Sequence, residues 1–309
     1  MNAHVYMLPS FTMESMLSAV IEYQIKELML VPPIVIRMVR DPVVQKFLPQ
    51  LSHITRFSSG AAPCSEEVLK QVEERFPGTG FKQGYGMTES CSCISAHPAD
   101  KYSYKYAHTG GTIVGNTEVK FLNEEGEELG LMQPGEIYAR GPQIVMGYLN
   151  NPKATEETFL PGGWLRTGDQ GMIDDEGFLH ITDRLKEMIK VKGIAVAPAE
   201  LEDLLLGHPN VEDCAVLSIP DEWSGEKPKA YIVTKGAHAS EQLGRDILKY
   251  VKDNKVRYKH IKEIEFITEI PKSPSGKILR RVLKDKMKAE DYGLRVREED
   301  SVPSAKAKL

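Results

Sequence analysis

The sequence is poor in cysteine, in long apolar runs and in net charge. Four cysteines occur in 309 residues, and their spacing matches neither a disulfide framework nor a zinc site, so reduced thiols are expected. No apolar run approaches the roughly 20 residues of a membrane-spanning helix. Residues 1–10 lack the basic and apolar regions of a signal peptide. These features exclude a disulfide-stapled scaffold and a membrane span.

The formal net charge is −5, which argues against nucleic acid as the main partner. With 41% hydrophobic and 27% charged residues, the composition is that of an ordinary globular protein, long enough for one large domain or two smaller ones. Residues 227–288 nevertheless hold 17 Lys and Arg against 7 Asp and Glu, a local excess of +10. A solvated face and attraction of a polyphosphate ligand both explain this excess, and charge alone does not decide between them.

The first part of the chain predicts alternating helices and strands. A helical pattern starts at Met13, and the apolar run 28–31, followed by Pro32-Pro33, indicates a buried strand closed by prolines. Ser65 is a candidate N-cap for a helix with one apolar face, formed by Val68, Leu69, Val72 and Phe76. This order favours a piece of a parallel α/β sheet.

The pattern changes at about residue 110 and again at about residue 187. Alternating strands at 118–122 and 136–140, separated by turns rich in Asn, Asp and Gly, predict an antiparallel sheet or a small barrel. After residue 187, Pro198 and Gly207 bracket a helix. The remaining elements predicted for this small α+β domain are strands at 214–219, 230–233 and 264–268 and a helix at 241–253.

Four segments carry residues suited to chemistry. In the first segment, residues 83–89, Gly84 and Gly86 free the backbone for the close approach of a ligand. Thr88 could form a hydrogen bond with a phosphate, and Glu89 could bind Mg²⁺. A strand-to-turn junction with a solvated Glu is the alternative, and composition alone favours it. In the second segment, 164–169, an aspartate beside a glycine suits a ribose diol, although an Asx turn explains it equally well.

The other two segments are basic. Residues 183–193 place three lysines and an arginine where two domains would meet, and a charged linker is the alternative. Residues 271–281 include Gly276-Lys277, but the upstream glycine of a Walker phosphate loop is missing. What remains there is a lysine on a Pro/Ser/Gly loop that could reach into a neighbouring site as a point charge.

The order and spacing of these segments are more specific than any one of them. Together with Gly60-Ala61-Ala62-Pro63 and residues 140–148, they resemble the signature series of the superfamily of acyl-CoA synthetases, peptide-synthetase adenylation domains and luciferases. The series is most similar to the 4-coumarate–CoA ligase group, through Gly-Tyr-Gly-Met-Thr-Glu and Asp-Arg-Leu-Lys-Glu-Met-Ile-Lys. The resemblance covers about residues 5–288.

The resemblance implies a ligase that uses ATP, Mg²⁺ and coenzyme A. A carboxylic acid first becomes an acyl-adenylate, and the thiol of coenzyme A then displaces AMP. Cations and Mg²⁺ would stabilise the charge that accumulates in the first step. By motif match, the nucleotide-binding residues are Gly84, Tyr85 (adenine), Thr88 (α-phosphate), Asp169 and Arg184 (ribose), Glu89 is the Mg²⁺ ligand, and Lys277 is the lysine of the adenylation step.

The resemblance also implies a moving second domain. The predicted boundaries are 1–185 for part of the large AMP-binding domain, 187–288 for a mobile C-terminal domain and 289–309 for a disordered tail. Lys186 matches the hinge position. Rotation there would withdraw Lys277 and present a face from Lys190 to Gly193 to coenzyme A.

Two departures from the family pattern are visible. A Ser/Thr/Gly-rich loop with its lysine, which would cradle the β- and γ-phosphates, is not found, so the N-terminal half of the large domain is expected to be missing and the sheet to have an unpaired edge. Ala195 stands where coumarate-type ligases have a glutamine that contacts the adenylate. The hypotheses are therefore a fragment of an acyl-CoA ligase, a truncated inactive paralogue with a partial nucleotide- or partner-binding surface, and an enzyme that acylates a carrier protein.

The C-terminal Ala307-Lys308-Leu309 is a variant of the peroxisomal Ser-Lys-Leu address. It predicts a peroxisomal location and an import receptor as partner; without it, a cytoplasmic location is expected. The acid itself is not readable, so fatty-acid, aromatic-acid and secondary metabolism all stay open.

Overall fold

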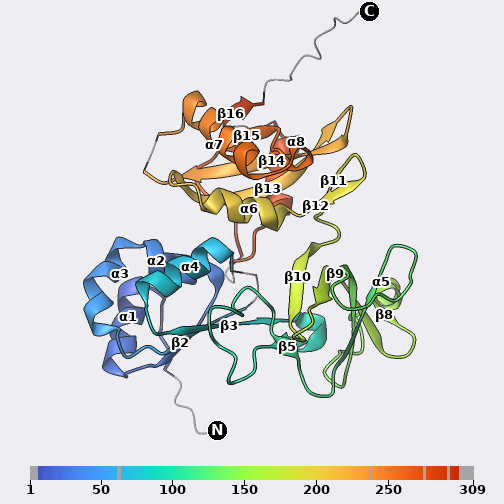
Figure 1. The fold of residues 1–309 in the computed structure, drawn as a ribbon, viewed down its shortest axis with the longest axis horizontal. Coiled ribbons are helices and arrows are strands. Elements are labelled where there is room, and N and C mark those ends of the chain that lie inside the picture. Colours follow the sequence, from blue (N-terminus) through green and yellow to red (C-terminus); the bar gives the residue numbers. More distant parts are fainter. Residues whose placement is uncertain (1–5, 61–63, 237, 274–275, 291–292, 299–309) are drawn as a thin grey trace, which may run out of the picture. The chain divides into compact units, whose positions relative to one another are not determined.

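The computed structural model describes residues 6–60, 64–236, 238–273, 276–290 and 293–298. The chain forms two compact units (Figure 1). The first comprises residues 1–186 together with 273–277, and the second comprises residues 187–272 and 278–309. Within the described ranges, no helix has both the length and the apolar character that a membrane crossing requires.

The first unit contains a five-stranded mixed sheet in the order β1-β2-β3-β4-β5. Pairing is parallel between the first three strands and antiparallel between the others. The strands are β1 (Glu27–Leu30), β2 (Arg56–Ser59), β3 (Gly80–Tyr85), β4 (Ser95–Ala96) and β5 (Thr112–Ile113). The parallel part confirms the predicted α/β character.

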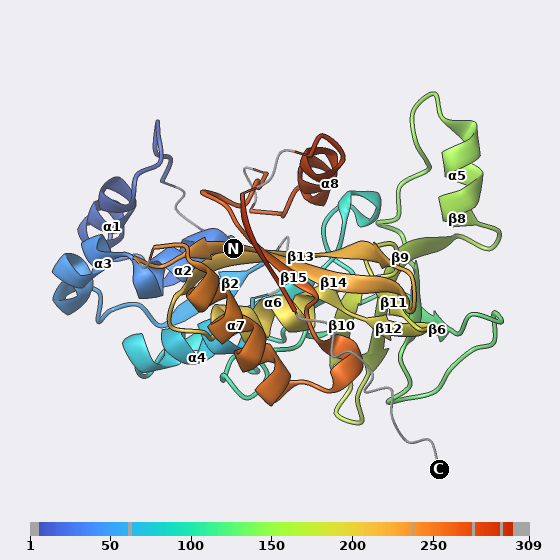
Figure 2. The ribbon, with the colours of Figure 1, turned by 90° about the horizontal axis from the view of Figure 1, so that it is seen from above.

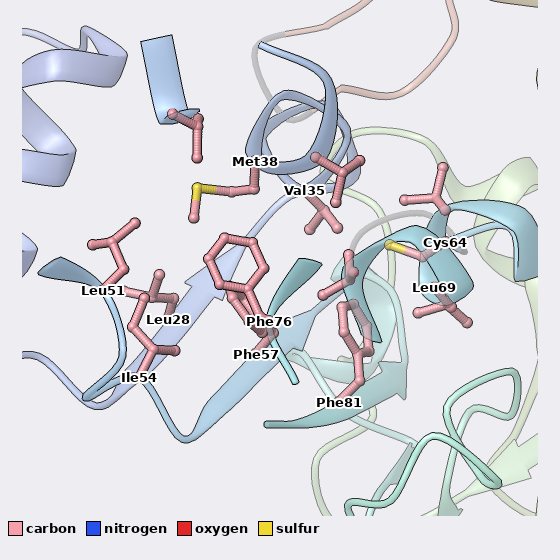
Figure 3. Packing of buried hydrophobic residues seen from close by; sticks show 14 of the residues in the cluster. Leu28, Val35, Met38, Leu51, Ile54, Phe57, Cys64, Leu69, Phe76 and Phe81 are labelled. Atoms are coloured by element: carbon pink, nitrogen blue, oxygen red, sulfur yellow. The ribbon is translucent and has the colours of Figure 1, made fainter. Parts of the chain in front are cut away.

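Helices pack on this sheet through a continuous apolar core. Figure 3 shows Val35 and Met38 of one helix close to Phe57 and Phe76. Ser65 caps a second helix as predicted, because its side chain accepts a hydrogen bond from the Val68 N–H. The helices are α1 (Met13–Glu22), α2 (Pro32–Arg40), α3 (Pro42–Phe47) and α4 (Glu66–Arg75), with the 3₁₀ turns η1 (Leu48–Gln50) and η2 (Thr88–Ser90).

The predicted buried strand at 28–31 was only partly right. In β1 the side chain of Leu28 is buried, whereas Met29 is 85% exposed, because successive side chains of a strand point to opposite faces. The prolines do not close the strand either. Pro32 is instead the first residue of α2, where the missing N–H of proline costs nothing.

The second sheet of this unit is antiparallel and open. Its order is β10-β9-β7-β6, and β8 pairs with β9. In the described part of the chain, no pairing between β6 and β10 closes this sheet into a barrel. The expected barrel is therefore corrected to an open sheet, which has too few strands to curl around packed side chains. The elements are β6 (Glu118–Leu122), β7 (Gly135–Arg140), α5 (Pro152–Thr158), β8 (Phe159–Leu160), β9 (Trp164–Ile173) and β10 (Leu179–Arg184).

The second unit is α+β, as predicted. Its sheet has the order β12-β11-β14-β15-β16, and β13 also pairs with β14. Helices α6 and α7 lie on one side of the sheet and α8 on the other (Figure 2). The first two share one apolar cluster, and α8 packs on a second. The elements are β11 (Ile189–Val191), β12 (Ile194–Val196), α6 (Pro198–Leu206), β13 (Val211–Asp221), β14 (Gly225–Thr234), α7 (Glu241–Asn254), η3 (Arg257–Lys259), β15 (Glu263–Phe266), α8 (Arg280–Lys288) and β16 (Leu294–Arg297).

The prediction of a disordered tail from residue 289 was wrong for β16, which pairs antiparallel with β15. Buried charges explain the difference. Glu263 is 3% exposed and accepts from Arg297 at 2.5 Å and from the buried Lys229 at 2.8 Å. Val296 packs so close to α7 that a Cβ on Gly244 would lie 2.5 Å from it. The polar end of the chain thus supplies partners for buried groups; residues 299–309, with the predicted peroxisomal signal, lie outside the described part.

Candidate functional site

Asp169 is the centre of a polar group in the first unit. It lies on β9 opposite Arg184 of β10, and the Arg184 Nε is 3.5 Å from its Oδ1. Tyr85, the last residue of β3, donates its hydroxyl proton to Asp169 Oδ2 at 2.7 Å. The two sheets of the unit therefore meet at one carboxylate, and three of the predicted nucleotide-binding residues are brought together.

Burial controls the protonation of this group. Asp169 is 7% exposed, and burial raises its pKa, while the hydrogen bond from Tyr85 and the charge of Arg184 offset part of the rise. Burial and the adjacent Asp169 charge also raise the pKa of Tyr85 far above its ordinary value. Tyr85 therefore stays protonated and donates, and the carboxylate keeps further lone pairs for a ligand.

The segment after β3 folds back tightly on itself. A Cβ at Gly86 would lie 1.5 Å from the backbone oxygen of Ser92, so only glycine fits there. The Ser90 Oγ accepts from the Met87 N–H at 3.1 Å within this turn. Thr88 is exposed at the start of the following 3₁₀ turn. Gly84 pairs with Ala96 on β4 and directly precedes the tyrosine of the polar group.

Glu89 is held by a residue that had been given no role. The Tyr148 hydroxyl donates to Glu89 Oε1 at 2.6 Å, and the Val145 N–H donates to the Glu89 carbonyl oxygen at 3.0 Å. The Gly147-Tyr148 dipeptide belongs to the signature series. The order of the motifs therefore pointed to Tyr148, but it did not predict that the Tyr148 hydroxyl contacts Glu89. Among the described residues, no cluster of three or more His, Cys, Asp or Glu could hold a metal. A lone carboxylate fits Mg²⁺, which takes one or two carboxylates and completes its shell with phosphates and water.

Two of the predicted residues, Lys190 and Gly193, lie in the second unit on the β11–β12 hairpin. Lys190 is exposed and pairs in register with Ala195, and its N–H donates to Glu226 Oε2 at 2.8 Å. Lys192 and Gly193 form the turn with φ of 53° and 79°, the pattern of a two-residue hairpin loop. The hairpin therefore displays Lys190 and Ala195 on its surface.

Lys277 and Lys186 lie on loops. Lys277 is exposed, and its carbonyl oxygen accepts from the Ser273 N–H at 2.9 Å while its own N–H donates to Ser273 Oγ at 3.1 Å. Gly276 completes this turn with a φ of 84°. Lys186 is exposed in the turn after β10 and is the last residue before the second unit. Residues 61–63 and 274–275 of the signature series lie outside the described part.

Two family models match this chain. The model described as AMP-binding enzyme matches residues 2–149, and the model described as AMP-binding enzyme C-terminal domain matches residues 200–277. The chain belongs to the AMP-binding enzyme family. The resemblance predicted from the order of the motifs is thereby confirmed.

Relatives within the AMP-binding family agree with this assignment. The chain is 43% identical over 293 residues to 4-coumarate-CoA ligase 1 of Narcissus pseudonarcissus, covering 94% of this chain and 53% of that protein. It is 42% identical over 283 residues to peroxisomal OPC-8:0-CoA ligase 1 of Arabidopsis thaliana, covering 90% and 51%. The chain spans about half the length of the curated relatives it matches.

A solved structure gives the same picture of this AMP-binding chain. The crystal structure of the anthranilate CoA ligase AuaEII in complex with anthranoyl-AMP superposes with a TM-score of 0.79 at 28% identity. The match covers 90% of this chain and 52% of that one. The adenylate-forming fold is therefore shared over nearly all of the sequence.

Removing the Tyr85 hydroxyl should raise the pKa of Asp169 further. In Tyr85→Phe the carboxylate loses the hydrogen bond that favours its charged form, while its burial is unchanged. Carboxyl-carbon NMR titration of Asp169 measures the effect. Tyr104→Phe is the control, because the Tyr104 hydroxyl pairs with Thr79 Oγ1 at 3.0 Å instead. An unchanged pKa in Tyr85→Phe would show that this hydrogen bond does not hold the carboxylate.

Proposed function

We propose that the chain acts in the ATP-dependent activation of a carboxylic acid and the transfer of its acyl group to coenzyme A. In the first step, a carboxylate oxygen bonds to the α-phosphorus of ATP and pyrophosphate leaves. In the second, the coenzyme A thiolate bonds to the acyl carbon and AMP leaves. The observation that carries the proposal is the buried Asp169 flanked by Tyr85 and Arg184, in a chain similar to proteins named as CoA ligases.

Asp169 is the proposed ribose ligand. One of its oxygens already accepts from Tyr85, yet a carboxylate has about four acceptor positions, so two ribose hydroxyls can still donate to it. Arg184 lies beside it as an exposed cation that can reach a nucleotide oxygen. The Tyr85 ring is proposed to lie against the adenine.

Thr88 and Glu89 are proposed to face the phosphates. The exposed Thr88 hydroxyl can donate to an α-phosphate oxygen. Mg²⁺, when bound by Glu89, would offset the negative charge that accumulates on the phosphates. Tyr148 orients Glu89 by donating to one of its oxygens and leaves the other free to bind the ion.

Two lysines are proposed to alternate in the two half-reactions: Lys277, on a loop that both enters from and returns to the second unit, and Lys190 of the second unit. The observed division of the chain after Lys186 supports a hinge at that residue and the domain limits 1–185 and 187–288. Lys277 would bridge the carboxylate and the α-phosphate during adenylation. Lys190 and Gly193 would take part in the thioester step. The exposed Ala195, with only a methyl group, cannot make there the side-chain contact that a glutamine would make.

Lys277→Ala should abolish acid-dependent release of pyrophosphate while largely sparing ATP binding. The loss of the bridging charge should slow adenylation by about 100- to 1,000-fold. The assay couples pyrophosphate release to a panel of aromatic and fatty carboxylic acids, and ATP binding is measured by calorimetry. Lys284→Ala, which removes another exposed lysine, is the control. Normal pyrophosphate release by Lys277→Ala would sink the assigned role, and no release by the unchanged chain with any acid would sink the proposed activity.

Tyr148→Phe should weaken divalent-ion binding by about tenfold, because the ligand carboxylate loses the partner that orients it. Titration of Mn²⁺ in the presence of ATP, followed by electron paramagnetic resonance, measures this. Tyr138→Phe is the matched control, since the Tyr138 hydroxyl donates to Glu136 at 3.3 Å in the same unit. Equal Mn²⁺ affinity in the two variants would contradict the assignment of Glu89.

A peroxisomal location is part of the proposal. It rests on Ala307-Lys308-Leu309 and on the relative named as a peroxisomal CoA ligase. Residues 295–309 placed at the C-terminus of a fluorescent reporter should direct it to peroxisomes through the import receptor. The same segment with Lys308→Glu should leave the reporter in the cytosol. A diffuse signal from the unchanged segment would contradict the proposed address.

A further inference from the structure

The Lys277 loop stands on a short stem that belongs to the second unit. Lys272 and Ile278 pair as an antiparallel bridge below the loop. Further down, the Leu279 N–H donates to the Pro271 carbonyl oxygen at 2.8 Å. The two legs of the stem are therefore residues 271–272 on one side and residues 278–279, directly before α8, on the other.

Both legs are fastened by ion pairs. The Lys272 Nζ lies 2.6 Å from Asp213 Oδ2 of β13. On the other leg, Arg280 is the first residue of α8 and uses its whole guanidinium group. Its Nη1 is 2.7 Å from Glu187 Oε2, its Nη2 is 2.6 Å from Glu202 Oε1, and its Nε donates to the Val216 carbonyl oxygen at 3.4 Å.

The Arg280 cluster is largely shielded from water. The side chains of Arg280, Glu187 and Glu202 are 16%, 22% and 12% exposed. Glu202 Oε1 also accepts from the Val216 N–H at 2.8 Å, which ties α6 to β13 at the same point. A planar guanidinium can serve these partners together, whereas a lysine ammonium acts as a single point charge.

Glu187 connects this cluster to the boundary between the units. It is the first residue of the second unit and directly follows Lys186. Arg280 thus connects the residue at the unit boundary with the base of the loop that carries Lys277. Within the second unit, these two distant parts of the chain are held by one side chain.

We propose that Arg280 is a positioning residue that makes the boundary residue Glu187 and the Lys277 loop one rigid piece. The inference rests on the proposed function and adds to it a residue that acts through Lys277. A reorientation at Lys186 then carries the loop with it, and Lys277 arrives at the adenylation site in a defined place. Misplacement of such a group by about 1 Å can cost about 100-fold in rate.

The first test is amide hydrogen exchange on the whole chain. In Arg280→Ala and in the milder Glu187→Gln, the amides of Gly276, Lys277 and Leu279 should exchange at least about tenfold faster than in the unchanged chain. Arg281→Ala is the control, because this neighbouring side chain is 94% exposed. Unchanged loop exchange in a folded Glu187→Gln or Arg280→Lys variant would overturn the proposal, whether or not the chain has ligase activity.

The second test separates the half-reactions. Arg280→Lys and Glu187→Gln should slow acid-dependent pyrophosphate release by about 100-fold, as expected for a misplaced lysine. Thioester formation from a supplied acyl-adenylate should stay within about twofold, because that step does not use Lys277. Equal losses in both steps would show that Arg280 only stabilises the fold. If the unchanged chain releases no pyrophosphate with any acid, the proposed function fails. The hydrogen-exchange comparison then tests the positioning role of Arg280 by itself.

Discussion

The hydrogen bond between Tyr85 and Asp169 is the constraint on which the first unit depends. A carboxylate this deeply buried is costly unless donors surround it. The donors come from different elements, since Tyr85 ends β3 and Arg184 ends β10. The end of β3 is therefore tied to the middle of β9 and the end of β10, and the backbone turns back tightly at Gly86 directly after Tyr85.

The second unit solves a similar problem with cations. Lys229 is 1% exposed and lies 2.8 Å from Glu263 and 2.6 Å from Glu265, on the strand next to its own. Arg297 of β16 completes this group, and Arg280 forms the other shielded group. Buried charges need partners in fixed positions. The charged groups around Lys229 and Arg280 therefore fix the strands and loops that supply their partners. The loop with Lys277 and the hairpin with Lys190 extend from that fixed frame.

The sequence predicted elements that carry their own boundary signals. Ser65 before α4, and Pro198 and Gly207 around α6, act on adjacent backbone and need no tertiary context. The predictions that failed depended on distant partners. Strand β16 pairs with β15 and adds Arg297 as a partner of the buried Glu263, and the open edge of the second sheet depends on how many strands join it. Tyr148 and Glu89 lie 59 residues apart in the chain. The order of the motifs therefore included both residues but could not predict that they contact each other.

Strand β1 stands at one end of the five-stranded mixed sheet, and within the described residues no strand pairs with its outer side. The outer side of β1, beside the 85% exposed Met29, is the kind of edge along which separate chains associate. Two molecules meeting there would share backbone hydrogen bonds and apolar contact. Charge screening by salt leaves such contacts in place, so dilution would keep such molecules apart.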